Sequence, residues 1–301
     1  MSITYKQMVD DVLSNLAGYT MRQDRMTHLT SSITSTSLTL NLGSVSNIGK
    51  GVVEIDDELI WIDSYDRISN TATVAPYGRG FAGTTAAAHD ADAKVTVAPT
   101  FPRHMVKKTI NEAIQAVYPS LFALGTTSLT YNSIRNTYAI PAEVSTVQYV
   151  SWQTVGPSKE WKPIKGWRHD SYASHDEWAT NNTLTIYDPI PAGRTIFVHY
   201  TKVPEAFDGA AETATFEETT GLQASARDVV IYGACYRLAS FIDSGRLNYS
   251  SAEADTADSK IQYGSGASTA RYFLNLYQLR LKEEMNKLRD LYPTRVHFTR
   301  Y

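Results

Sequence analysis

Three histidines and two aspartates in the second half of the chain have the side chains best suited to binding a metal ion. His169 and His175 are each followed by an aspartate, Asp170 and Asp176, and His199 lies in a later apolar stretch. Imidazole and carboxylate are common zinc ligands, but zinc sites usually space their ligands more tightly along the chain. A solvated loop rich in histidine and aspartate explains the same pattern, and we therefore predict no metal site.

Other residues with chemical potential have simpler structural interpretations. Residues 78–83 contain three glycines, but no helix of proper length follows them, as a phosphate-binding loop requires. The acidic residues 56–58 lack the spaced oxygen ligands of an EF-hand and are interpreted as a solvated turn. The sequence lacks the local motifs of serine hydrolases, P-loop nucleotidases and zinc proteases. We therefore expect no catalytic residues and no cofactor.

The densest aromatic stretch of the chain could stack on sugar rings or on a partner chain. Its six rings do not follow the period of two that places side chains on one face of a strand. We therefore favour a β-sandwich core whose rims are covered by tryptophans. The rings belong to Tyr149, Trp152, Trp161, Trp167, Tyr172 and Trp178.

The composition is that of a globular protein with little net charge. The 301 residues are 43% hydrophobic and 20% charged, and the formal net charge is -3. These values disfavour intrinsic disorder and a globally basic nucleic-acid-binding protein. No stretch approaches the roughly 18 continuous apolar residues of a membrane span, and we expect a soluble protein made in the cytosol without a signal peptide. The single cysteine, Cys235, lies in an apolar helical stretch and allows no internal disulfide.

Two hydrophobic periodicities alternate along the chain. Apolar residues at helical spacing predict four helices, in residues 4–17, 102–118, 229–242 and 269–291. Period-two alternation with turn residues predicts antiparallel strands in the regions between them. Helices that are too short or too apolar to stand alone can share one bundle. The predicted fold class is therefore α+β, a helical bundle with two inserted antiparallel β units of the small barrel or sandwich type.

The predicted domain boundaries follow the same periodicities. The helical bundle comprises residues 1–20, 101–126 and 221–292, and the two β insertions cover residues 27–100 and 127–205. Pro293 ends the last helix, because proline cannot continue it, and residues 293–301 are predicted to form a C-terminal docking tail. Basic and apolar residues alternate in this tail, a pattern suited to adding a strand or aromatic anchors to a partner protein. A frayed terminus without a role is the alternative interpretation.

Two stretches of the sequence resemble structural proteins of tailed bacteriophages. Residues 53–62, Arg79-Gly-Phe-Ala-Gly-Thr-Thr-Ala-Ala-Ala-His89 and residues 93–97 resemble a β-module that recurs in those proteins. Residues 184–204, with the helix expected after them, resemble a pattern of phage head-tail connector (adaptor) proteins. This chain departs from the small all-helical adaptors by carrying two β insertions, which leaves the placement of each unit open.

The resemblance implies a non-enzymatic virion protein that forms a ring, commonly of twelve copies, beneath the portal and joins capsid to tail around the DNA channel. The implied partners are the portal protein and other connector or tail proteins. Genome DNA would pass through without specific binding, and no membrane would be involved. The implied location is the neck of the virion, and the host cytoplasm during assembly. The implied portal-binding residues are Arg295, Val296, His297, Phe298, Arg300 and Tyr301.

Two regions of opposite charge suggest how copies could contact each other in such a ring. Residues 271–301 contain seven basic and three acidic residues, whereas residues 205–260 contain ten acidic and four basic residues. An acidic region of one subunit can meet a basic helix of its neighbour and fix the register of the contact. Two solvated faces explain the same charges. The candidate interface residues are Arg280, Lys282, Lys287 and Arg289.

Two other function classes stay open. The chain could be a tail-tip or fibre-associated β-rich module that binds a host glycan, in which case Trp161 is the residue to test. It could also be an enzyme, such as a cell-wall hydrolase with paired carboxylates, although no local signature supports catalysis.

Overall fold

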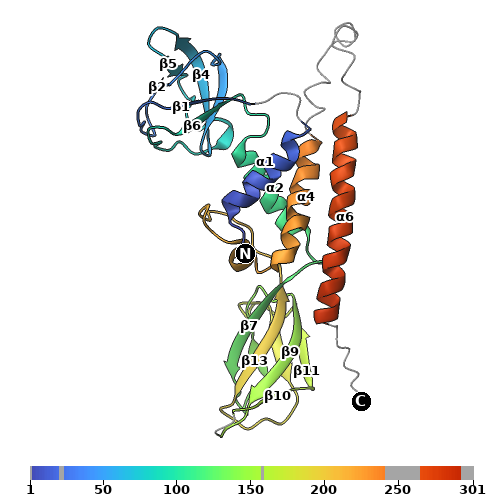
Figure 1. Ribbon diagram of the computed structural model, residues 1–301. Coiled ribbons are helices and arrows are strands. Elements are labelled where there is room, and N and C mark those ends of the chain that lie inside the picture. Colours follow the sequence, from blue (N-terminus) through green and yellow to red (C-terminus); the bar gives the residue numbers. More distant parts are fainter. Residues whose placement is uncertain (1, 20–23, 157–158, 241–264, 293–301) are drawn as a thin grey trace. The chain divides into compact units, whose positions relative to one another are not determined.

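The computed structural model describes residues 2–19, 24–156, 159–240 and 265–292, which form two compact units (Figure 1). The half-barrel unit comprises residues 6–113 and 231–276. The two-sheet unit comprises residues 1–5, 114–230 and 277–301. Both units are built on antiparallel β-sheet.

Six strands of the half-barrel unit form one curled antiparallel sheet. They are β1 (Arg25–His28), β2 (Thr39–Asn41), β3 (Gly51–Ile55), β4 (Glu58–Asp66), β5 (Thr71–Val74) and β6 (Lys94–Val97). Their order in the sheet is β1-β6-β3-β4-β5-β2, and the chain beyond edge strands β1 and β2 meets in an isolated bridge between Leu29 and Leu42. Asp56 and Asp57 form the turn between β3 and β4, and Asp56 adopts the left-handed conformation, with φ 52, that such two-residue hairpin turns require. The concave side of the sheet encloses an apolar core that includes Leu40, Ile55 and Ile60.

The long helices differ in how much of their surface they bury. They are α1 (Tyr5–Ala17), α2 (Arg103–Ala116), α4 (Arg227–Ala239) and α6 (Ser265–Leu291). Helix α1 buries residues at helical spacing, among them Met8, Val12 and Leu16, and α2 does the same with Val106, Ile110 and Ile114. Helix α4 is buried on several sides through small and branched residues. Helix α6 buries little apart from Phe273, Glu284 and Leu288, so most of its length is solvent-accessible.

Two smaller sheets form the second unit. The strands are β7 (Ala123–Thr130), β8 (Thr137–Ala139), β9 (Thr146–Gln153), β10 (Trp161–Pro163), β11 (Trp167–Asp170), β12 (Thr183–Ile186) and β13 (Thr195–Lys202). One sheet has the order β10-β9-β13-β7 and the other the order β11-β12-β8. Alternate residues of both sheets, including Val150, Leu184 and Val198, form a shared apolar core. A short helix, α3 (Phe216–Thr220), and the single turns η1 (Phe81–Gly83) and η2 (Ala224–Ala226) complete the described elements.

The prediction that the fold is a helical bundle with β insertions is wrong. The described chain is organised around curled and stacked β-sheets, with 30% of residues in helices and 28% in strands, and its helices do not form a bundle that carries the sheets. Helical periodicity shows that one face of a helix is buried, but it does not show which element covers that face. The same apolar stripes therefore fitted a bundle and the present architecture equally well.

Candidate functional site

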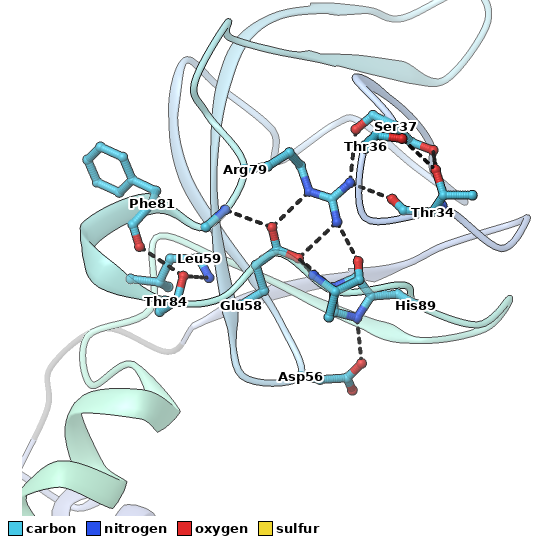
Figure 2. Close-up of polar contacts among 12 residues, drawn as sticks. Thr34, Thr36, Ser37, Asp56, Glu58, Leu59, Arg79, Phe81, Thr84 and His89 are labelled. Atoms are coloured by element: carbon cyan, nitrogen blue, oxygen red, sulfur yellow. Dashed lines mark hydrogen bonds and ion pairs between the residues drawn. The ribbon is translucent and has the colours of Figure 1, made fainter. Parts of the chain in front are cut away.

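A buried cluster of ionisable side chains lies at one end of the half-barrel sheet (Figure 2). Glu58 is the first residue of β4 and follows the turn that holds Asp56. Arg79 and His89 come from the long segment between β5 and β6. The side chains of Glu58, Arg79 and His89 are only 1%, 7% and 2% exposed. Charged side chains buried to this degree must have their hydrogen bonds supplied by the protein.

The Glu58 carboxylate accepts hydrogen bonds from every side of this cluster. Arg79 donates to it through Nε at 2.8 Å and Nη2 at 2.9 Å, which is the bidentate geometry of a strong ion pair. The backbone amides of Gly80 and Ala87 donate to it at 2.8 and 3.0 Å. Burial alone would raise the pKa of Glu58, but the bonds from Arg79, the two amides and His89 outweigh it and lower that pKa to about 2.

Arg79 also holds the surrounding backbone in place. Its guanidinium donates to the carbonyl oxygens of Thr34, Ser37 and Ala87 at 2.7, 3.0 and 2.6 Å (Figure 2). His89 lies between two carboxylates, with Nδ1 at 2.8 Å from Asp56 and Nε2 at 2.9 Å from Glu58. The Arg79 side chain therefore ties two segments, residues 34–37 and the backbone at Ala87, to the start of β4.

The segment between β5 and β6 folds back on itself to reach this cluster. Gly80 has a left-handed φ of 60, and a Cβ atom there would lie 2.8 Å from the carbonyl oxygen of Thr84. The Thr84 hydroxyl accepts from the Leu59 amide and donates to the Phe81 carbonyl. The backbone geometry thus requires glycine at position 80, and the Thr84 hydroxyl links the Leu59 amide to the Phe81 carbonyl.

A histidine between two carboxylates could in principle serve as a general base, but this cluster lacks what catalysis needs. Both ring nitrogens of His89 and both oxygens of Glu58 are already engaged by protein groups. A reacting group would also have to reach side chains that are almost fully enclosed. The arrangement is therefore a structural lock between the β3–β4 hairpin and the segment from Arg79 to His89.

A second buried carboxylate links the half-barrel sheet to helix α2. Glu54 of β3 is 5% exposed, and its Oε1 accepts a hydrogen bond from the backbone amide of Arg103, the first residue of α2. An acceptor at this position satisfies one of the free amides of a helix start. Burial raises the pKa of Glu54 to about 7, against the lowering effects of the Arg103 amide and guanidinium.

The candidate metal ligands of the sequence are not assembled into a site. His169 Nε2 lies 3.3 Å from the side chain of Asn182, and His175 Nδ1 lies 2.9 Å from that of Asn181. His199 lies on β13, where its ring contacts other aromatic rings. Within the described ranges, no three histidine, cysteine, aspartate or glutamate side chains are arranged to hold a metal ion. Cys235 is buried in α4, and burial raises the pKa of its thiol to about 12.

The four candidate interface residues on α6 differ in their contacts. Arg280 pairs with Asp228, Glu283 and Glu284, and Lys287 pairs with Glu284, so these two cations are used within the two-sheet unit. Lys282 and Arg289 are exposed, and neither forms an ion pair with another residue that the structure describes. The six candidate portal-binding residues, between positions 295 and 301, lie outside the described residues.

The aromatic stretch divides between the core and the surface. Trp152 and Trp167 pack against the core of the two-sheet unit. Trp161 is 45% exposed and begins a row of rings across three strands of the four-stranded sheet. The centroid distances are 5.3 Å from Trp161 to Phe197, 5.2 Å from Phe197 to His199 and 5.9 Å from His199 to Tyr149.

Sequence reasoning missed Phe197 and His199 as members of this row. Their signal was present, since both alternate with the buried Ile196, Val198 and Tyr200 along β13. The buried lock was also missed, because residues 56–58 were interpreted as a solvated turn. Its partners lie 21 and 31 residues from Glu58, a separation at which no local pattern gives a signal.

A cleft of about 440 Å³ lies among α2, α4 and α6 in the half-barrel unit. Lys108, Arg237 and Arg271 line it together with one acidic residue, Glu112. The described residues that line it include no histidine or cysteine. The cleft is a surface feature without an assigned ligand.

Comparisons with known proteins add no identification. No family model matches the sequence, and no curated protein matches it. Among the helices that the structure describes, none is long and apolar enough to span a membrane.

Proposed function

We propose that the chain is a structural subunit of a phage head-tail connector, which forms a homo-oligomeric ring between the portal and the tail. The observation that carries this proposal is the use made of the residues that resemble the phage β-module. Arg79, Gly80, Thr84 and His89 are engaged in holding their own backbone in place, with no group left to act on a substrate. A segment whose side chains stabilise its own backbone suits a scaffold protein, which must keep its shape under mechanical load.

The exposed surface of α6 supports the same proposal. Lys282 and Arg289 are exposed and have no ion-pair partner among the described residues, and Leu279, on the same helix, is 61% exposed. Protein contact surfaces combine apolar side chains at the centre with a polar rim, and arginine is enriched in them. A neighbouring subunit that presents carboxylates would complete both the charge and the apolar contact.

The test is a double charge reversal on α6. Lys282→Glu with Arg289→Glu should abolish ring formation on purified portal particles while leaving the fold intact, because neither side chain is buried. The matched control is Lys6→Glu, an exposed lysine on α1 without an ion pair among the described residues. Assembly is measured by co-sedimentation with portal particles. Equal assembly of the wild type and the double variant would remove α6 from the subunit interface.

The aromatic row favours one other candidate function, the binding of a glycan. Trp161, Phe197, His199 and Tyr149 offer adjacent ring faces and edges at the surface of an open sheet, and sugar rings stack on such surfaces. A glycan array with the wild type and Trp161→Ala separates the candidates. Saturable binding that the substitution abolishes would favour the glycan-binding module over the connector.

A further inference from the structure

The two edges of the four-stranded sheet are protected against strand addition to different degrees. Edge strand β10 has three residues, and they include Lys162 and Pro163. Lysine and proline on an edge strand commonly prevent the addition of another strand, because proline has no amide hydrogen and a charge resists burial. Edge strand β7 has eight residues, Ala123-Leu-Gly-Thr-Thr-Ser-Leu-Thr130, without a charge or a proline. The long edge strand β7 therefore lacks the features that prevent strand addition.

Strand β7 is paired on one side along its whole length. All eight residues are in register with β13, from Ala123 opposite Lys202 to Thr130 opposite Thr195. On its other side, no backbone hydrogen bond joins β7 to any residue in the described part of the chain. In contrast, the chain just beyond the edge strands β1 and β2 of the half-barrel sheet meets at the bridge between Leu29 and Leu42. An open edge of this length is a template for one more strand.

The edge is also held rigid from beneath. The ring of Tyr200 lies directly against Gly125, so that a Cβ atom at position 125 would be 2.3 Å from the ring. The Tyr200 hydroxyl donates to the Glu143 carboxylate, which fixes the ring in place. A pre-formed strand loses less conformational entropy when a partner strand joins it.

We infer that the open edge of β7 accepts residues 294–301 of a second copy of the chain as an added strand. The inference rests on the proposed function, since it requires several copies in one assembly. Residues 294–301 are rich in strand-forming types, and Arg295 and His297 alternate with Val296 and Phe298. In extended form, eight residues reach about 26 Å, which matches eight residues of β7 at the same rise.

The charges near one end of β7 suit a basic strand. Lys202, opposite Ala123, lies 3.2 Å from Glu143 and 2.5 Å from Glu205, so two partly exposed carboxylates share one ammonium group. The incoming segment carries Arg295 and Arg300 and no acidic side chain. A cationic strand therefore supplies the charge that this end of the sheet lacks and favours the pairing over that of a neutral segment.

The test measures amide hydrogen exchange of β7 in the full chain at low and high protein concentration. In the wild type, exchange in residues 123–130 should slow at least tenfold as concentration rises and copies associate. Deletion of residues 294–301 should remove this concentration dependence. Thr126→Lys should also remove the concentration dependence, because the new lysine places a positive charge on the edge strand and repels Arg295 and Arg300. The matched control is Thr39→Lys on strand β2, which should behave as the wild type does.

Each other outcome overturns the inference. Exchange in β7 that ignores both concentration and the deletion would show that the edge stays open. Protection that the deletion removes but that does not depend on concentration would place the segment on its own copy. Protection that appears only after portal particles are added would assign the edge or the segment to the portal. Co-sedimentation with portal particles, measured on the same samples, tests the proposed function separately, since it can persist while β7 exchanges freely.

Discussion

The two units of the chain use polar and aromatic side chains in opposite ways. The half-barrel unit encloses Glu58, Arg79 and His89 in a network whose groups bind one another, and the chain beyond its two edge strands meets in a bridge. The two-sheet unit has an apolar core, a row of aromatic rings on its surface and an unguarded edge strand. The first arrangement favours rigidity and the second favours contact with other molecules. Under the proposed function, the half-barrel unit would be the scaffold and the two-sheet unit would provide the contact surface.

The largest effect should come from breaking the buried lock. Glu58→Ala removes one partner of a buried ion pair and leaves the Arg79 guanidinium without its carboxylate. A loss of about 3–5 kcal/mol in the free energy of unfolding is expected, since an uncompensated buried charge is this costly. Urea denaturation of the wild type and the variant measures it. Glu160→Ala, at an exposed glutamate of the two-sheet unit, should cost less than about 0.5 kcal/mol. Similar small losses for both would mean that the lock does not hold the half-barrel together.

The next effect is the pH dependence of stability. The two buried carboxylates of the half-barrel unit change the free energy of unfolding with pH in opposite directions. Glu54 has a pKa of about 7 in the folded chain. Between pH 4.5 and 7, the folded protein keeps a proton that the unfolded chain has lost, so the free energy of unfolding falls as pH rises. Ionisation of Glu54 therefore lowers the free energy of unfolding by about 3 kcal/mol, at 1.36 kcal/mol per pKa unit. Glu54→Gln should remove this fall between pH 5 and 8, as measured by urea denaturation at both values.

Glu58 should behave in the opposite way in the acid range. Its folded pKa of about 2 lies below the ordinary value, so its contribution is present above pH 4.5 and is lost as pH falls toward 2. Glu58→Gln should flatten the acid limb of the stability profile without changing the limb between pH 5 and 8. A variant that alters both limbs equally would contradict the assignment of separate titrations to the two carboxylates.

A smaller effect is expected at the base of the open edge strand. Gly125→Ala places a methyl group against the buried Tyr200 ring, which is held by its bond to Glu143. Overpacking of this kind costs about 1–3 kcal/mol. Thermal unfolding should show the loss, and Thr127→Ala, on the same strand, provides the control. An unchanged melting temperature would mean that the ring moves aside freely and that β7 is not rigid.

The smallest effect on stability should come from the aromatic row. Trp161→Ala removes a ring that is 45% exposed, so the free energy of unfolding should change by about 1 kcal/mol or less. Denaturant unfolding checks this value. A loss of several kcal/mol would place Trp161 in the core of its unit rather than on a contact surface.

The strands could be predicted more readily than the way in which they associate. Residues 184–186 and 195–200 form strands as their alternation indicated. The burial of every second residue is a local pattern, which can be recognised from neighbouring positions in the sequence. The helices at 5–17 and 103–116 followed from apolar stripes in the same way. The bundle prediction failed because an apolar stripe on a helix does not indicate which element packs against it. The lock could not be predicted, because Glu58, Arg79 and His89 are far apart in the sequence and come together only in the folded sheet, and Glu58 was interpreted as part of a solvated turn.

The most direct test of the central claim is electron microscopy of the purified protein mixed with portal particles. If the chain is a connector subunit, rings of additional density should cap one end of the portal, and the Lys282→Glu, Arg289→Glu variant should leave that end bare. Portal particles that stay uncapped at micromolar wild-type protein would contradict the central claim.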